Sequence, residues 1–462
     1  METRPARGRF SRSFLVFWVM NAGRLPVLVL LIAAIVLASA TVARAQPRED
    51  DEKKPDLGSF PARIDEIRIT GLARTHQDVV RREIGFREGD VILEDDFDLA
   101  LTRLWNTTIF AHVRGRVVRE GARTVAVFEL EDRWSLRPVF SFGSGGGALY
   151  FDVGATDNNI AGRFLEATAY YENFNGFDGG YLVLKNPRLF WTRRVELTVQ
   201  AEQLIRPRPG FADRRALTAI EMAELIDRDR VRVGLRASAF ADRFLPPLDS
   251  PPHYPLPTES FLLEPRFRLG RIDTIRVRQR GATIDLRPGL GFTSSDVASE
   301  YVSMIGEVIA FAMPGKRWNL ALRARAASVS KVPEHLQLYA GGLDLVRGFP
   351  DNYVRTRAYA MANFEARYVA FDSTWVALIP AVFVDVIGAR NPQGDGGGAL
   401  SAGAGVRFVV PKFVASGLRV DLAMPLASSM RSVEESERRF GAVTPPVTLG
   451  SIHPSVGVYQ FF

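Results

Sequence analysis

The side chains of residues 357–368 alternate strictly between two kinds. A period of two predicts a β-strand, because neighbouring side chains of a strand point to opposite faces. One mostly polar face and one small or apolar face are typical of a strand between lipid and an aqueous lumen, although soluble sheets also alternate. The polar face carries Arg357, Tyr359, Met361, Asn363, Glu365 and Arg367, and the other carries Ala358, Ala360, Ala362, Phe364, Ala366 and Tyr368.

The same alternation recurs over residues 134–462, with arginines repeatedly opposite the apolar side chains, as in 231–239, 318–326 and 418–422. A membrane strand and its turn take roughly 20 residues, so this region predicts about 16 strands. We therefore expect a transmembrane β-barrel of antiparallel strands, while composition alone also allows a large soluble β protein. Gly- or Pro-rich breaks stand at 143–147, 206–210, 245–256 and 391–398.

The first 45 residues have the pattern of a secretory signal peptide. Five arginines precede an apolar run over residues 25–40, and Ala43-Arg44-Ala45 offers a small-x-small cleavage site before Gln46. The apolar run is long for a signal, so a membrane anchor is the alternative. No later apolar run approaches the roughly 20 residues that a membrane helix needs.

The formal net charge of +7 belongs mostly to this leader. Residues 1–45 hold six Arg and one Glu, so 53 basic and 51 acidic residues follow them, a net charge of +2. A net charge this small argues against a nucleic-acid partner, because such partners are bound through an excess of positive charge. The absence of cysteine excludes disulfides and thiolate metal sites.

We find no constellation of residues that indicates catalysis. The five histidines stand at no metal-ligand spacing, and no Gly-x-Ser-x-Gly elbow is present. The Gly-rich run at 143–147 lacks the Lys-Ser/Thr of a phosphate-binding loop. We therefore expect no enzyme activity, no metal and no cofactor.

Residues before 134 divide into a linker and a small domain. The stretch 46–59 is charged and poor in apolar residues, which indicates a solvated linker. Residues 60–132 mix strand and helix periodicities, in the order β-α-α-β-β. The expected elements are a strand over 63–70, helices over 76–84 and 95–106, and strands over 111–119 and 124–131.

A loop before the alternating strand carries Val346, Arg347, Gly348 and Phe349, and a later strand carries Phe383 and Asp385. These two motifs resemble those of the bacterial surface-antigen superfamily, which includes BamA, TamA-type factors and two-partner-secretion transporters. Residues 60–132 resemble its POTRA domain, and 134–462 its 16-stranded barrel. The resemblance implies that this loop folds into the barrel, where its arginine meets an acid on the wall.

Arg347 is the central residue of that expectation. Its guanidinium offers a rigid fork of donors that matches a carboxylate, which lysine cannot reproduce. Asp385 is the first choice of partner because the resemblance points to the Phe-x-Asp acid, and Glu365 is the second. Gly348 permits a sharp turn, and Phe349 then packs against the inner wall.

The chain ends in an alternating aromatic segment with Tyr459, Phe461 and Phe462. It resembles the signal by which outer-membrane barrels are recruited for insertion. Gln460 departs from that pattern, because an apolar residue is expected two positions before the end. A strand register shifted by one residue would explain this difference, because Tyr459 and Phe461 would then face lipid and Gln460 would not.

The resemblance implies an outer-membrane assembly or translocation factor with its POTRA domain in the periplasm. Its partners would be an unfolded or nascent β-rich client, outer-membrane lipid and, as an open point, an inner-membrane or periplasmic protein. A single POTRA domain favours an accessory or client-restricted role over general assembly. A two-partner-type secretion pore or a passive channel is the alternative.

Overall fold

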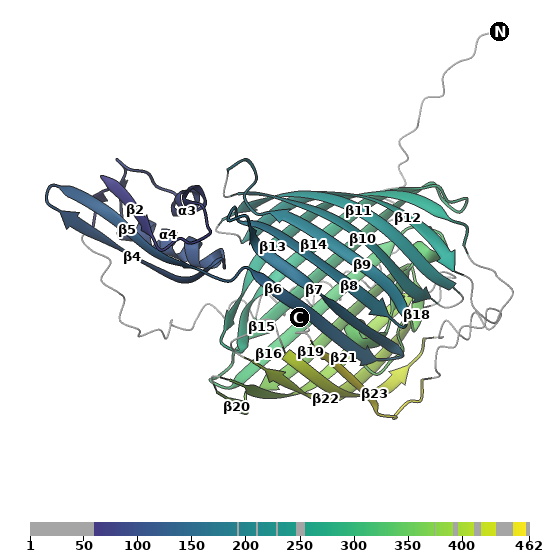
Figure 1. Cartoon of the computed structure of the whole chain (residues 1–462). Coiled ribbons are helices and arrows are strands. Elements are labelled where there is room, and N and C mark those ends of the chain that lie inside the picture. The colour runs from purple at the N-terminus through teal and green to yellow at the C-terminus, as the bar shows by residue number, and fades with distance from the viewer. Residues whose placement is uncertain are drawn as a thin grey trace, which may run out of the picture. The chain divides into compact units, whose positions relative to one another are not determined.

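The computed structural model describes residues 60–462, except 192–193, 209–210, 228–229, 246–254, 374, 391–395, 411–416, 431–446 and 459–462. Two architectures follow one another along this part of the chain, an α/β domain and then a closed barrel (Figure 1). The expected signal peptide and linker, and the aromatic residues Tyr459, Phe461 and Phe462, lie outside the described residues. No helix in the described part is long and apolar enough to cross a membrane.

The N-terminal domain has a three-stranded sheet in the order β2-β5-β4, in which β2 is parallel and β4 antiparallel to β5. The expected order of strands and helices is confirmed, and a short pair, β1 and β3, adds to it. Its elements are β1 (Ala62–Arg63), β2 (Glu66–Thr70), α3 (Gln77–Ile84), β3 (Val91–Ile92), α4 (Glu94–Asn106), β4 (Phe110–Glu120) and β5 (Arg123–Asp132).

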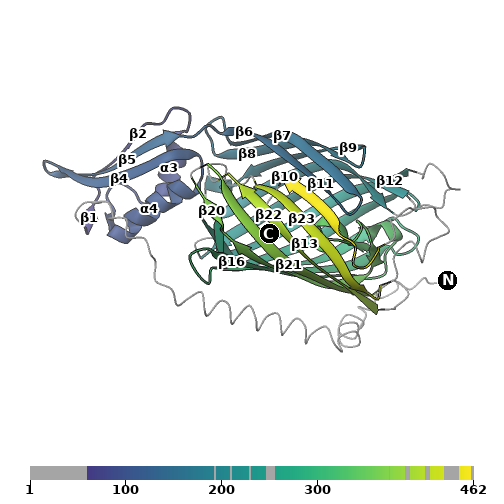
Figure 2. The same ribbon diagram turned by 90° about the horizontal axis from the view of Figure 1, so that it is seen from below.

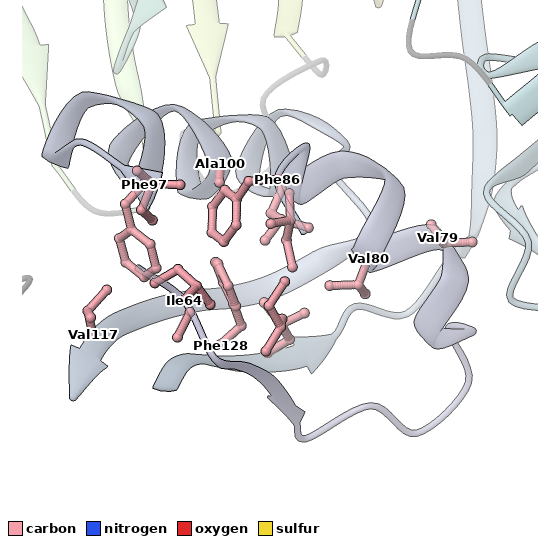
Figure 3. Packing of buried hydrophobic residues seen from close by; sticks show 14 of the residues in the cluster. Ile64, Val79, Val80, Phe86, Phe97, Ala100, Val117 and Phe128 are labelled. Carbon is pink, nitrogen blue, oxygen red and sulfur yellow. The ribbon is translucent and has the colours of Figure 1, made fainter. Parts of the chain in front are cut away.

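Both helices bury one apolar face against this sheet (Figure 3). In α4, Phe97, Ala100 and Leu104 recur at helical spacing and are fully buried. The ring of Phe97 lies 5.1 Å from the ring of Phe128 on β5. Each large apolar side chain buried in this way contributes about 1.5–3 kcal/mol, so this cluster holds the helices on the sheet.

The carboxylate of Asp132, at the end of β5, fixes the segment before α3. Its Oδ2 accepts hydrogen bonds from the backbone N–H groups of Ala73, Arg74 and Thr75, at 2.8, 2.5 and 3.0 Å. Its Oδ1 accepts the hydroxyl of Thr75 at 2.5 Å. Burial alone would raise the pKa of Asp132, but these four donors outweigh it and lower the pKa below its usual range.

The barrel consists of sixteen long antiparallel strands, as the alternation predicts, with the two-residue β20 beside β21 (Figures 1 and 2). The break at 143–147 is shorter than expected, because β6 continues to Gly145. The strands are β6 (Leu136–Gly145), β7 (Ala148–Ile160), β8 (Leu165–Phe174), β9 (Phe177–Asn186), β10 (Val195–Arg208), β11 (Phe211–Ile226), β12 (Val231–Leu245), β13 (Thr258–Ile275), β14 (Arg278–Thr293), β15 (Glu300–Ala312), β16 (Trp318–Val329), β19 (Ala358–Tyr368), β20 (Phe371–Asp372), β21 (Ala377–Arg390), β22 (Gly396–Val409), β23 (Gly417–Ser428) and β24 (His453–Val458).

The two faces of the wall carry the side chains that the alternation assigns to them. On β19, the alanines and Phe364 lie on the face opposite the buried Tyr359, Met361 and Glu365. The inner arginines bind acids of neighbouring strands. Arg232 on β12, for example, reaches Glu196 and Glu221 at 2.5 Å each. Ion pairs therefore line the inner face.

The first and last strands of the barrel, β6 and β24, pair with each other and close the barrel at a seam. In the described residues, β24 pairs with β6 through three residue pairs, from Val456–Ser144 to Val458–Phe142. On its other side, β6 pairs with β7 over all ten of its residues. On the seam side, the pairing is described as far as Val458, where the described residues end.

Candidate functional site

The connection between β16 and β19, residues 330–357, lies against the inner wall, and we call it the inner loop. It contains a two-stranded hairpin and two short helical turns. The expectation that this segment folds into the barrel agrees with its contacts to inward-facing residues on both sides of the lumen. Its elements are η2 (Glu334–Leu336), β17 (Leu338–Ala340), α5 (Gly342–Leu345) and β18 (Val354–Thr356).

Glycines shape the tip of the inner loop. Gly341 and Gly348 have φ angles of 131° and 85°, which side-chain-bearing residues rarely adopt. A Cβ on Gly341 would lie 2.3 Å from the carbonyl oxygen of Pro350. A Cβ on Gly348 would lie within 3.3 Å of Pro425 and Ala423 on β23. Glycine at these positions thus lets the backbone approach the wall closely, so that the side chain of the adjacent Arg347 reaches into the wall.

Arg347 binds Asp385 in the bidentate manner expected of an arginine fork. Its Nε and one terminal nitrogen each lie 2.8 Å from a carboxylate oxygen of Asp385. The backbone N–H of Arg347 donates to the same carboxylate at 3.1 Å. The guanidinium carbon lies 3.5 Å from the ring centroid of Phe383, a cation–π contact. Asp385 therefore fixes both the side chain and the backbone of the loop.

Two further acids complete the site around Arg347. Its other terminal nitrogen lies 3.0 Å from Glu365 on β19 and 3.4 Å from Asp421 on β23. Arg407 on β22 binds both of these acids, and Arg367 binds Glu365 at 2.7 Å. Arg419 approaches Asp421 at 3.2 Å. All three carboxylates are fully buried.

We call these seven residues the arginine cluster. Burying ions costs several kcal/mol each, and only close pairing with complete hydrogen bonding offsets that cost. Glu365 and Asp421 each bind more than one of the four guanidinium groups, whereas Asp385 binds Arg347, so removal of Arg347 leaves the buried carboxylate of Asp385 without its cation. The cluster is therefore sensitive to single substitutions. Its members are Arg347, Glu365, Arg367, Asp385, Arg407, Arg419 and Asp421.

Two glycines on β22, Gly403 and Gly405, make room for this arrangement because they have no side chain. A Cβ on Gly405 would lie 1.9 Å from Oδ1 of Asp421 and 2.8 Å from a terminal nitrogen of Arg407. A Cβ on Gly403 would lie 2.4 Å from the ring of Phe383. The alternating glycines of β22 thus create the space in which the ring and the ion pairs sit.

Phe349 secures the apolar side of the loop tip. Its side chain is 1% exposed, and its ring lies 5.0 Å from that of Tyr353. Val346 belongs to the same buried cluster, which extends to Tyr359 and Met361 on β19. The loop tip therefore combines an ionic and an apolar attachment to one side of the wall.

His335, near the start of the inner loop, attaches to the opposite side of the lumen. Its Nε2 lies 2.9 Å from the hydroxyl of Thr258 on β13 and 3.4 Å from a carboxylate oxygen of Asp242 on β12. Arg215 on β11 donates to both oxygens of Asp242, at 2.6 and 3.2 Å. His335 and Asp242 are both buried. We call these four residues the histidine anchor.

Further contacts join the loop to strands between the two attachments. Arg208 on β10 donates to Asn352 at 2.6 Å and stacks over the ring of Tyr339 at 4.3 Å. The backbone N–H of Asp351 donates to the carbonyl of Gly146 in the β6–β7 turn at 2.7 Å. The inner loop thus touches strands around the wall and crosses the lumen.

The structure brings together all of the expected loop and wall residues, Val346, Arg347, Gly348, Phe349, Phe383, Asp385 and Glu365. Asp385 and Glu365 both bind Arg347, so the first and second choices of partner act together. Sequence reasoning missed Asp421 and Arg407, although Asp421 already stood on the predicted polar face. It also missed His335, for which the only signal was its place a few residues before the glycine pair.

Comparison with known proteins supports this architecture. Residues 62–129 match the family described as "POTRA: Surface antigen variable number repeat". BamA from Haemophilus ducreyi lacking POTRA domains 1–3 has a similar structure, with a TM-score of 0.62 at 16% identity, covering 86% of this chain and 84% of that one. CdiB from Acinetobacter baumannii gives 0.60 at 12%, covering 86% and 73%. CdiB from Escherichia coli also gives 0.60 at 12%, covering 86% and 76%.

No curated protein sequence matches the chain. At these identities the structural likeness establishes the fold. The chain therefore combines a POTRA domain with a closed 16-stranded antiparallel barrel whose lumen is crossed by an anchored loop. Its fold is that of BamA and CdiB.

Proposed function

We propose that this chain is an outer-membrane protein that inserts or translocates a β-rich client, with its POTRA domain in the periplasm. The observation that carries the proposal is the combination of a POTRA domain with a closed 16-stranded barrel whose lumen is crossed by an anchored loop. One POTRA domain in the described residues supports an accessory or client-restricted role. No catalytic step is part of this proposal.

The POTRA sheet offers a docking edge for the client. β4 is an edge strand of eleven residues, and it pairs only with β5 in the described part of the chain. Its exposed side chains include Arg114, Arg116 and Arg119. An extended client segment can add to such an edge through backbone hydrogen bonds, with acidic side chains favoured beside the arginines. β2 is the less open edge, because Glu88 already accepts the N–H of Ile67 at 3.2 Å.

The seam offers the second step of client handling. β6 and β24 are the first and last strands of the barrel, and backbone hydrogen bonds of about 0.5–1.5 kcal/mol net each join them. A client strand can pair with β6 where these hydrogen bonds open. Insertion of the client into the membrane through the seam is the step that we propose here.

Secretion through the lumen is the second candidate function. The ion-paired inner face and the size of the barrel favour it, since a polar lumen suits an unfolded chain in transit. It requires the inner loop to leave its seat. A passive channel is less well supported than secretion, because the inner loop crosses the lumen and would obstruct free diffusion.

Site-specific photo-crosslinking in intact cells tests the proposal. A photo-reactive residue at Arg114 on β4 should capture a client protein. At Phe140 on β6, whose side chain is 58% exposed beside the seam, it should capture the same client if insertion is the function. At the inward-facing Arg325 it should capture the client if secretion through the lumen is the function.

Leu235 on β12 is the matched control, because it is 47% exposed on the outer wall far from the seam in strand order. Client adducts from Phe140 but not from Leu235 would support insertion. Equal adducts from both positions, or none from Arg114, would overturn client handling through the POTRA edge and the seam.

A further inference from the structure

An apolar groove of about 520 Å³ lies on the outer wall, across β16, β19, β21, β22 and β23. These strands are neighbours in the barrel (Figure 1). The small residues Ala366 and Ala404 alternate with Val382 and Leu422, to which they are paired in register across the strands. Val382 and Leu422 are 58% and 51% exposed, so they stand out as ridges while the alanines leave a hollow.

Two aromatic side chains bound this groove at one end. Trp318 on β16 and Tyr368 on β19 are paired in register, and their ring centroids lie 5.1 Å apart. Both line the groove. Aromatic rings with a polar edge favour the boundary between hydrocarbon and head groups. The Trp318 end of the groove is therefore the end nearest to the membrane surface.

Cations stand directly at that end. Lys316 and Arg317 occupy the turn before Trp318, and both are exposed. A terminal nitrogen of Arg317 lies 3.4 Å from the hydroxyl of Tyr368. Among the described residues, the nearby acid Asp372 is paired with Arg276 at 3.0 Å and so is engaged elsewhere than with Lys316 and Arg317. Arg278, whose guanidinium donates to the carbonyl of Gly315, adds to this positive field.

We propose that this groove binds a phospholipid with an anionic head group. One acyl chain would lie over Ala366 and Ala404, and the phosphate would meet Arg317 and Lys316 beside Trp318. The inference rests on the proposed membrane location. The turn at 313–317 is at the same end of the barrel as the start of β6, the end that follows the POTRA domain, so the lipid belongs to the periplasmic leaflet.

The site also lies behind the arginine cluster. Glu365 and Ala366 are consecutive on β19, as are Asp421 and Leu422 on β23, with one side chain on each face of the wall. An acyl chain in the groove therefore covers the outer face of the wall segment that holds the inner loop.

The test is native mass spectrometry of the full chain after reconstitution in vesicles of equal phosphatidylglycerol and phosphatidylethanolamine. Wild type should retain one phosphatidylglycerol in preference to phosphatidylethanolamine. Lys316→Gln and Arg317→Gln should each lower that preference about fivefold, because a cation near a membrane surface contributes about 1 kcal/mol. Ala404→Leu fills the hollow and should lower retention of both lipids.

Arg194→Gln removes a cation from another turn at the same end of the barrel, and Ala239→Leu enlarges an outward side chain on β12. Both should retain lipid as wild type does. An inserted wild type without head-group preference, or groove variants that match these controls, would overturn the lipid site alone. Failure of the chain to insert into vesicles at all would instead overturn the proposed membrane function.

Discussion

The inner loop is held at two places that differ in kind. At its tip, the arginine cluster places seven charged residues in a buried network that joins β19, β21, β22 and β23. Near its start, the histidine anchor relies on one imidazole between a hydroxyl and a carboxylate that already has an arginine partner. The difference shows that the tip is fixed by buried ion pairs that share partners, whereas the start is fixed by a few separable contacts.

The largest effect is expected at the tip. Arg347→Ala leaves the buried carboxylate of Asp385 without the cation that it binds and should destabilise the seated loop by about 3–5 kcal/mol. Arg347→Lys should restore little, because a lysine ammonium cannot bind Asp385 through two parallel bonds. A single cysteine introduced by Leu345→Cys reports on the tip, since the chain has no native cysteine. Its thiol-labelling rate should rise at least tenfold in Arg347→Ala.

Arg323→Ala is the control for this substitution, because Arg323 is an inner-wall arginine with Glu307 as its acid partner at 2.7 Å. It should leave labelling at position 345 near the wild-type rate, while single-channel conductance changes in Arg347→Ala. In a double-mutant cycle, Arg347→Ala and Asp385→Ala together should cost less than the sum of the two. Strict additivity would contradict the pairing as the source of the effect.

A smaller effect is expected at the start of the loop. His335→Ala removes the contact with Thr258 and should weaken the anchor by about 1–2 kcal/mol, because Asp242 keeps Arg215 as its partner. The labelling rate of a cysteine introduced by Gln337→Cys should rise by several-fold. Labelling at position 345 should stay unchanged. If both positions responded equally to His335→Ala, the two attachments would be one cooperative unit and the comparison would fail.

The smallest effect is expected at Asp132 in the POTRA domain. This residue holds the segment 73–75 through uncharged donors, so it adds a third kind of loop attachment to the comparison. Its pKa is lowered in the folded state, so its stabilisation is complete above the unfolded-state value, about pH 4, and is lost as the pH falls through the folded-state value. Amide-exchange protection at residues 73–75 of the full chain, corrected for intrinsic rates, should be constant from pH 8 to pH 5. It should fall below about pH 4.

Asp132→Asn should lower the protection of these amides already at neutral pH, by about 1 kcal/mol, and remove the acid-dependent step. If this variant still lost amide protection below about pH 4, the loss would be due to another acidic residue of the domain.

Sequence reasoning went furthest where a local pattern determines the structure. Alternation fixes which side chains of β19 face inward, and helical spacing places Phe97 and Leu104 in the POTRA core. It also reached Arg347 and Asp385, because flanking glycines and a motif resemblance marked them. It did not reach Asp421 or His335, since their partners come from strands whose relative height depends on the register of the closed barrel. No single segment of sequence contains that register.

The way in which the inner loop spans the lumen also constrains the order of folding. Arg347 reaches an acid 74 residues later in the chain, and His335 reaches a hydroxyl 77 residues earlier. The loop can therefore take its final place only after strands on both sides of it have been laid down. Such distant contacts form slowly because chain entropy is lost before they stabilise anything. During synthesis and assembly, the lumen would stay unobstructed until nearly the whole wall exists, and seating of the loop would be among the last events of maturation.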